Sequence, residues 1–332
     1  MPVYGKMRGQ EVTGLKRTSL LQGLRQIIQT FVEGYTTLNR RLWVLAIPIG
    51  LDLFLWLGPW ISPQQASDSL AGAFQANAYL EAEQAAQAVT ALREWGQQTN
   101  LTHVLSTLLL PALIPGLEAP ATLGGYAQPY WMPAAAWVVT LIPLLGLALG
   151  LLLWSLYLLP LADLVRESGE RGVIMLRRVP RVWWRMALLV VMVLLAGGLF
   201  LLVAGLLTLV AGLFSAGAAM LLLWASGAMV LWVTFYVYFT PSAILFSGVN
   251  PWRAMLYSAQ VVRSGVWSSL GFILLSLVVR AGTVALWQHL AGHPVGVLAG
   301  ILLNAYVVSG LAAAGLVFYR DRLRLLLARE KG

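Results

Sequence analysis

Long apolar stretches, separated by shorter polar segments, dominate the chain. Six of these stretches approach or exceed the roughly 20 residues that an α-helix needs to cross a bilayer. The pattern therefore predicts an all-α integral membrane protein with six transmembrane helices. We place the predicted spans at residues 42–61, 133–161, 186–214, 218–238, 266–290 and 295–318.

The polar segment between the first two spans, residues 62–132, is much longer than the other connections. Within it, residues 71–98 are rich in Ala, Glu and Gln, which favour an α-helix. Residues 105–117 are apolar but too short to cross a bilayer, and Pro111 and Pro115 interrupt them. We therefore expect a helical outer insertion that includes a re-entrant or surface-lying stretch.

Two segments carry apolar residues on one helical face, which is typical of helices that lie in the membrane interface. The first covers residues 20–38, although packing against a partner would give the same pattern. The second follows Pro241, which should end or kink the preceding span. Asn250 can cap this second helix, Pro251 can occupy its first position and Gly265 can end it.

Basic residues collect at alternate ends of the predicted spans. All but two of the 22 lysines and arginines fall in residues 1–41, 166–185, 253–263 and 320–331; the exceptions are Arg93 and Arg280. Positively charged loops stay cytoplasmic, so both termini are predicted inside and the insertion outside. Residues 1–41 then form a cytoplasmic tail with an interfacial helix, and residues 42–332 form the six-span membrane domain.

Composition narrows the classes of function. The chain is 59% hydrophobic and 11% charged, far outside the range of soluble domains. The net charge of +9 is split among several loops instead of gathering on one folded face, which argues against a nucleic-acid partner. We expect the basic side to attract anionic lipid headgroups, although it could serve only to fix orientation. The absence of cysteine excludes disulfides, thiolate metal sites and cysteine nucleophiles.

Asp52 and Arg280 are the only charged residues predicted at bilayer depth. A charge at that depth costs at least about 2.5–3.5 kcal/mol, so each should face a partner or water. At about 1.5 Å per residue, Asp52 lies about 15 Å, and Arg280 and Asn304 about 21 Å, from the inner ends of their spans. These three residues could form a buried polar cluster, which would serve either as a transport or proton site or as a pair that locks the bundle.

His289 and His293 are four residues apart, which would place both on one helical face. With a third ligand such as His103 they are a candidate zinc site, and an interfacial pair beside a turn is the alternative. No Gly-x-Ser-x-Gly, His-Glu-x-x-His or phosphate-loop pattern occurs. The sequence therefore predicts neither an enzyme activity nor a cofactor.

The most distinctive stretch is residues 240–275. It combines Pro241-Ser-Ala-Ile-Leu-Phe, Pro251-Trp252-Arg253-Ala-Met-Leu-Tyr-Ser258 and Arg263-Ser-Gly-Val-Trp267. This stretch resembles the membrane domain attached to some bacterial glycerophosphodiester phosphodiesterases, and its stand-alone six-helix relatives. In that family a kinked span leads to an amphipathic helix with an Ala-x-x-x-Ser core, and Gly-x-Trp starts the next span.

The resemblance implies six helices in a bacterial cytoplasmic membrane. We expect no catalytic residue to carry over, because the phosphodiesterase catalytic domain is not within this chain. The long outer insertion departs from the compact family pattern. We therefore expect a non-enzymatic integral membrane protein: a scaffold or accessory subunit of a larger assembly, or a lipid-interacting module. The alternative is a small-solute or lipid transporter that uses Asp52 and Arg280. Membrane lipids and other membrane subunits are the expected partners.

Overall fold

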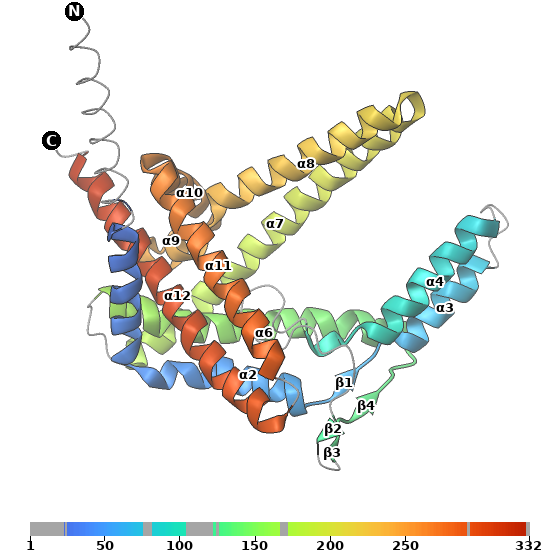
Figure 1. The fold of residues 1–332 in the computed structure, drawn as a ribbon, viewed down its shortest axis with the longest axis horizontal. Helices are drawn as coiled ribbons and strands as arrows, with labels where there is room; N and C mark the ends of the chain where they lie inside the picture. The colour runs from blue at the N-terminus through green and yellow to red at the C-terminus, as the bar shows by residue number, and fades with distance from the viewer. Residues whose placement is uncertain are drawn as a thin grey trace, which may run out of the picture. The chain divides into compact units, whose positions relative to one another are not determined.

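The computed structural model describes residues 23, 25–75, 82–103, 122–123, 126–166, 172–290 and 293–329. Within these residues the regular elements are helices apart from two pairs of two-residue strands (Figure 1), which confirms the predicted all-α class. Residues 25–39 form the first helical segment. The elements after it are η1 (Leu42–Leu45), α2 (Ala46–Leu57), β1 (Trp60–Ile61), α3 (Gln64–Gln75), α4 (Ala82–Gln98), η2 (Leu101–His103), β2 (Thr122–Leu123), β3 (Tyr126–Ala127), β4 (Tyr130–Trp131), α6 (Ala136–Arg166), α7 (Gly172–Phe214), α8 (Ala216–Val237), α9 (Thr240–Ser247), α10 (Pro251–Ser264), α11 (Val266–Leu290) and α12 (Pro294–Arg329).

Five stretches within the described residues are long and apolar enough to cross a membrane. They are Trp137–Arg166, Met175–Phe214, Ala216–Ser247, Val266–Trp287 and Pro294–Ala328, and they correspond to the second to sixth predicted spans. The first predicted span, residues 42–61, contains a shorter apolar helical stretch, Leu42–Leu57. Helix α2 ends before Gly58, whose N–H donates a hydrogen bond to the Phe54 carbonyl at 2.7 Å. The next residue, Pro59, has no N–H with which to continue the helix.

The chain divides into two compact units. The first comprises residues 1–41, 158–281 and 310–332, and the second comprises residues 42–157 and 282–309. The second unit has an apolar contact between α2 and the start of α12, where Trp56 and Ile301 pack with Ile49, Leu53 and Val297.

Four phenylalanines form the centre of the first unit. Phe272 of α11 stacks on Phe318 of α12 with ring centroids 4.8 Å apart, and Phe318 stacks on Phe239 at 5.2 Å. Phe31 of the 25–39 helix also stacks on Phe272, at 5.1 Å. Such pairs contribute about 0.5–1.5 kcal/mol each beyond the area that they bury. The cluster therefore joins the 25–39 helix, the end of α8, α11 and α12.

Two glycines allow the 25–39 helix to approach α12 closely. A Cβ added at Gly34 would lie 2.5 Å from the backbone nitrogen of Ala314 and 2.6 Å from its Cα. A Cβ at Gly310 would collide with the ring of Tyr35. Only glycine, which has no Cβ, leaves room for these contacts. The backbones of the two helices therefore meet at Gly34, and the Tyr35 ring packs on the α12 backbone at Gly310.

The apolar stripe predicted for residues 20–38 is thus divided between two roles. Ile27 and Leu38 are buried at 6% and 0% exposure, whereas Ile28 and Val32 are 57% and 60% exposed. The buried part packs on helices of the same chain, which the sequence pattern did not predict. The exposed part remains available to a membrane surface. Leu20, Leu21 and Leu24 lie outside the described residues.

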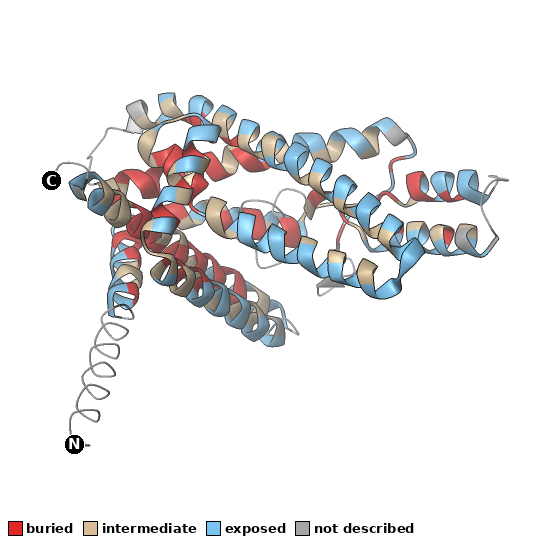
Figure 2. Ribbon diagram, turned by 90° about the horizontal axis from the view of Figure 1, so that it is seen from above, coloured by how far each residue is buried: buried red, intermediate tan, exposed pale blue. Residues whose placement is uncertain are grey.

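Helices α7 and α8 form a hairpin that turns at Ser215 and extends away from the other helices of the first unit (Figure 1). The 43 residues of α7 correspond to about 65 Å of helix. Among its described side chains, α7 is buried only near its start, at Val179, Val182 and Met186, and α8 buries none. Both arms are largely exposed (Figure 2), and from residue 186 onward their exposed large side chains are apolar, as expected of helices surrounded by lipid or by another membrane protein.

A break separates α8 from α9, as Pro241 predicted. Ser258 of α10 satisfies the backbone there: its hydroxyl accepts the Phe239 N–H at 3.1 Å and donates to the Tyr236 carbonyl at 2.7 Å. Side chains of neighbouring helices commonly satisfy the groups that a break frees in a membrane helix. α9 then ends at Gly248, whose φ of 58° is the left-handed conformation that glycine adopts at little cost.

The described part of the insertion at residues 62–132 belongs to the second unit. Residues 71–98 are helical where they are described, but they belong to two helices, α3 and α4. These run side by side in opposite directions: Gly96 approaches Ser67, and Arg93 pairs with Asp68 at 3.8 Å. β1 pairs with β4 in parallel, and β2 pairs with β3 in antiparallel register. The apolar stretch at 105–117 lies outside the described residues.

Candidate membrane-interface site

Asp52 and Asn304 are both completely enclosed in the second unit. Asp52 is 0% exposed on α2, and Asn304 is 1% exposed on α12. Asp52 lies one turn before Trp56, and Asn304 lies nearly one turn after Ile301, the two residues that pack together. Since the end of α2 meets the start of α12, this register places Asp52 and Asn304 on the facing sides of the two helices. The predicted contribution of both residues to a buried polar region is consistent with these positions.

Further buried polar groups lie in the same unit, and the sequence reasoning missed them. The Tyr157 hydroxyl of α6 donates to the Ser309 hydroxyl of α12 at 2.8 Å, and both side chains are buried. Gln128 is also buried, and its Nε2 donates to the Leu55 carbonyl at 3.4 Å. Uncharged polar residues such as these occur at both buried and exposed positions, so the sequence did not distinguish them. Their burial inside the second unit is evident only from the structure.

Arg280, the third member of the predicted cluster, lies on α11 in the first unit and is exposed. Asp52 and Asn304 belong to the second unit. The pairing of Asp52 with Arg280 therefore stays a prediction.

His289 and His293 are each engaged with the backbone. His289 Nδ1 lies 2.8 Å from the Ala285 carbonyl, and His293 Nδ1 accepts the Val295 N–H at 3.3 Å. Within the part of the chain that the structure describes, no group of three His, Cys, Asp or Glu residues could hold a metal ion. His103 instead packs edge-on against Trp60 at 6.0 Å, and burial lowers its pKa below the ordinary value of 6.5. These positions offer no observation in favour of the zinc hypothesis.

Helix α10 has the predicted bounds, with Asn250 at its N-cap position, Pro251 as its first residue and Gly265 directly after it. The Asn250 side chain makes no capping hydrogen bond. Its buried face consists of small or compact residues: Pro251, Ala254, Ser258, Val261 and Val262.

The larger side chains of this region face away from the unit. Trp252 is 62% exposed, Leu256 50% and Trp267, at the start of α11, 84%. Arg253 is exposed as well, and Arg263 lies over the Tyr236 ring at 5.8 Å. An exposed surface of tryptophan, leucine and arginine is the composition expected of an interfacial helix.

Four arginines on the basic side of the first unit stabilise its fold. Arg166 donates to the carbonyls of Leu245 and Phe246. Arg178 pairs with Asp163 at 3.3 Å. Arg320 binds Glu33 at 2.6 Å and Asp321 at 2.8 Å, and Arg322 donates to Ser268 at 2.5 Å. These contacts fix α9, α7, the 25–39 helix and α11 to their neighbours.

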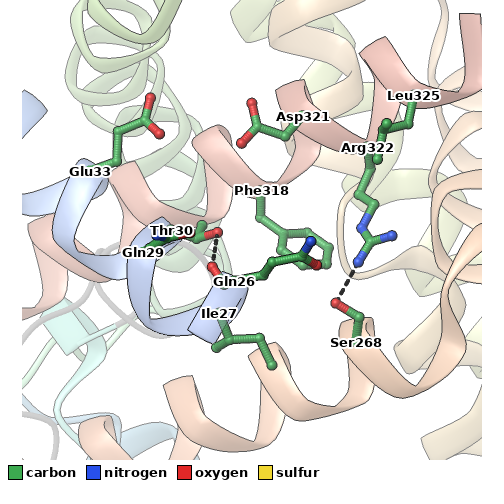
Figure 3. A pocket seen from close by; sticks show the side chains of 10 residues that line it. All are labelled: Gln26, Ile27, Gln29, Thr30, Glu33, Ser268, Phe318, Asp321, Arg322 and Leu325. Carbon is green, nitrogen blue, oxygen red and sulfur yellow. Dashed lines mark hydrogen bonds between the residues drawn. The ribbon is translucent and has the colours of Figure 1, made fainter. Parts of the chain in front are cut away.

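A polar cavity of about 220 Å³ lies between the 25–39 helix, α11 and α12 (Figure 3). Its lining residues are Gln26, Ile27, Gln29, Thr30, Glu33, Ser268, Phe318, Asp321, Arg322 and Leu325. Glu33 and Asp321 already pair with Arg320, and Arg322 already binds Ser268. The two carboxylates of Glu33 and Asp321 balance the two guanidinium charges of Arg320 and Arg322, so this cavity has no net charge that would attract an anion or a cation.

A second cavity, of about 530 Å³, lies between α7 and the start of α10; we call it the α7–α10 cavity. Its lining residues are Arg181, Trp184, Arg185, Leu188, Met192, Asn250, Pro251 and Trp252. The sequence predicted Asn250, Pro251 and Trp252 as interfacial residues, and it placed the basic and tryptophan residues of α7 at a span entry, but it did not reveal that the two groups lie opposite each other. The cavity combines basic, aromatic and apolar side chains, which is the composition of a lipid contact at the membrane surface.

No known protein family matches this chain, and neither a curated protein nor a solved structure matches it.

Proposed function

We propose that the protein is a non-enzymatic integral membrane protein that serves as a scaffold or accessory subunit of a larger membrane assembly, or as a lipid-interacting module. The observation that carries this proposal is the α7–α8 hairpin. Its length suits a membrane crossing, yet hardly any of its apolar surface is used for contact within the chain. A helix pair that its own protein leaves uncovered is available to lipid and to another membrane chain.

Glycines on α7 favour a protein partner for part of this surface. A Cβ added at Gly197, Gly198 or Gly205 would meet no other atom within 4 Å, whereas one at Gly212 would lie 3.8 Å from the Ala219 side chain of α8. Small residues in membrane helices commonly permit close approach of a neighbouring helix. Since three of the four face open space within this chain, a helix of another chain could approach there.

The proposed arrangement in the membrane has six crossings, with Leu42–Leu57 as part of the first, and with both termini in the cytoplasm of a bacterial cell. The distribution of arginine and lysine supports this orientation, because positive segments stay cytoplasmic. The resemblance of residues 240–275 to the phosphodiesterase membrane domain supports the six-helix count and the bacterial membrane. Anionic lipid headgroups and other membrane subunits are the proposed partners.

Copurification in a mild detergent tests the assembly role. We expect a stoichiometric protein partner with the wild-type chain, and its loss in a Gly198→Leu, Gly205→Leu double variant because leucine would block the open face of α7. Gly282→Leu is the matched control, since Gly282 of α11 also meets nothing within 4 Å. If the wild-type chain purifies alone, as a single copy, the assembly role is contradicted. The lipid-interacting module is then the proposed function that still stands.

The second candidate is a transporter of small solutes or lipids. The complete burial of Asp52 and Asn304 favours it, because enclosed polar groups at bilayer depth often line transport paths. The alternative interpretation of Asp52 is a structural pair with Arg280 that locks the bundle.

Thermal unfolding of Asp52→Asn, Arg280→Gln and the double variant tests the predicted pair. If the two residues are coupled, the double variant should lose less than the sum of the two single losses. Additive losses would show that the two residues are not coupled.

A further inference from the structure

Two arginines of the α7–α10 cavity differ from the other basic residues described above. Among the residues that the structure describes, no carboxylate pairs with Arg181 or Arg185, whereas Arg178 one turn earlier pairs with Asp163. Arg181 and Arg185 are four residues apart on α7, so they share one helical face, and their charges act on each other. Two like charges that line one cavity without a protein counter-charge attract an anion.

The opposite wall of the cavity is the start of α10. The amides in the first turn of an α-helix have no acceptor within the helix, and the helix dipole makes this end partly positive. The Asn250 side chain does not cap them. Arg185 extends towards this wall, since its Nη1 lies 3.5 Å from the position of a Cβ built on Gly248. Both walls therefore favour negative charge in the space between them.

The cavity changes from basic to apolar along α7. Leu188 and Met192 follow Arg181 and Arg185 on the same face, at intervals of three or four residues. Residues 186–214 carry no charge, so Arg185 is the last charged residue before the apolar length of α7. Trp184 and Trp252, which are 61% and 62% exposed, lie at this boundary, where tryptophan is enriched in membrane proteins.

We propose that the α7–α10 cavity binds an anionic phospholipid, with its phosphate held by Arg181 and Arg185 and its acyl chains along Leu188 and Met192. A soluble anion would satisfy the arginines but would leave the apolar side chains and the two tryptophans without a role. A zwitterionic lipid would cover the apolar surface but would bring a positive group to a site that is already basic. The inference rests on the proposed membrane insertion of α7.

Lipid titration of the purified chain in a mild nonionic detergent tests the proposal. The shift of the unfolding temperature with added lipid gives an apparent affinity, because a ligand that binds only the folded state stabilises it. Phosphatidylglycerol and phosphatidylcholine with identical acyl chains are the two probes. At about 1 kcal/mol per basic residue, we expect Arg181→Gln to weaken phosphatidylglycerol binding about fivefold, and Arg181→Gln with Arg185→Gln about 25-fold.

The matched control removes the same two charges elsewhere in the first unit, by Arg25→Gln with Arg324→Gln, two exposed positions outside the cavity. It should bind phosphatidylglycerol as the wild type does. The single variant Arg181→Gln alters only an exposed side chain and keeps the test decisive if the double variant does not fold.

Three outcomes would overturn the proposal: equal affinity of the wild type for both lipids, an equal loss in the control and cavity variants, or stabilisation by inorganic phosphate as strong as that by phosphatidylglycerol. The partner test at Gly198 and Gly205 probes another part of α7, so either proposal can fail while the other holds.

Discussion

Replacement of Gly34 by alanine should loosen the 25–39 helix from α12. The new Cβ would lie 2.5, 2.6 and 2.8 Å from the nitrogen, Cα and Cβ of Ala314. Carbon atoms pack at about 3.5–4.0 Å, so the two helices would have to separate by about 1 Å. The obstacle is mainly the backbone of another helix, which cannot turn aside as a flexible side chain can.

The expected loss follows from two opposing effects. Overpacking costs about 1–3 kcal/mol, whereas alanine in place of a helical glycine contributes about 0.5–1 kcal/mol of stability. We therefore expect Gly34→Ala to lower the free energy of unfolding by about 1–2 kcal/mol. Gly227→Ala on α8 is the control, because its Cβ would meet nothing within 4 Å and only the favourable effect remains.

Thermal unfolding in detergent measures the loss, and thiol labelling shows where it arises. The chain has no cysteine of its own, so Ile27→Cys and Ile28→Cys each introduce a single thiol. Ile27 is 6% exposed and Ile28 57%, so only the first should react faster in the Gly34→Ala background. Unchanged stability together with unchanged protection at Ile27 would refute the described contact of the 25–39 helix with α12.

Further outcomes are expected at three sites. Ser258→Ala should lower the free energy of unfolding by about 1–3 kcal/mol, measured by thermal unfolding, because the Phe239 N–H and the Tyr236 carbonyl lose their shared partner. Tyr157→Phe should cost a similar amount, since the buried Ser309 hydroxyl loses its donor, and adding Ser309→Ala should give less than the sum of the two single losses. The pKa of His103 is lower in the folded chain, so the unfolded chain binds a proton at a higher pH than the folded chain does. The stability that neutral His103 contributes to the fold is therefore present above pH 6.5, and it is lost as the pH falls from 6.5 to the lowered pKa. His103→Gln should flatten this pH dependence in melts recorded across that window.

Local signals explain why parts of the fold could be predicted from the sequence. Pro241, Asn250, Pro251 and Gly265 act through their own backbone preferences, and the structure has α9, α10 and α11 where those residues indicate. The apolar runs likewise predicted the five helical stretches that, within the described residues, are long and apolar enough to cross a membrane. Both kinds of signal depend on residues that are close together in the chain.

Contacts between distant segments could not be predicted in this way. The stripe in residues 20–38 indicated a one-sided helix, but it did not reveal that Gly34 meets Ala314, or that Ile28 stays exposed while Ile27 is buried. The site illustrates the same limit. Arg178 and Arg181 look alike in the sequence, and only the position of Asp163 shows that one is paired while the other lines a cavity.

The orientation of the chain is the central claim of the proposed membrane arrangement, because it places the basic segments and the α7–α10 cavity on the cytoplasmic side. Single cysteines introduced by Gln75→Cys on α3 and by Gly332→Cys test it with a thiol reagent that does not cross membranes. We predict that intact cells label the position at 75 and leave the position at 332 unlabelled until the membrane is opened. Labelling of 332 and protection of 75 in intact cells would contradict the account, because the basic α7–α10 cavity would then face the outer leaflet.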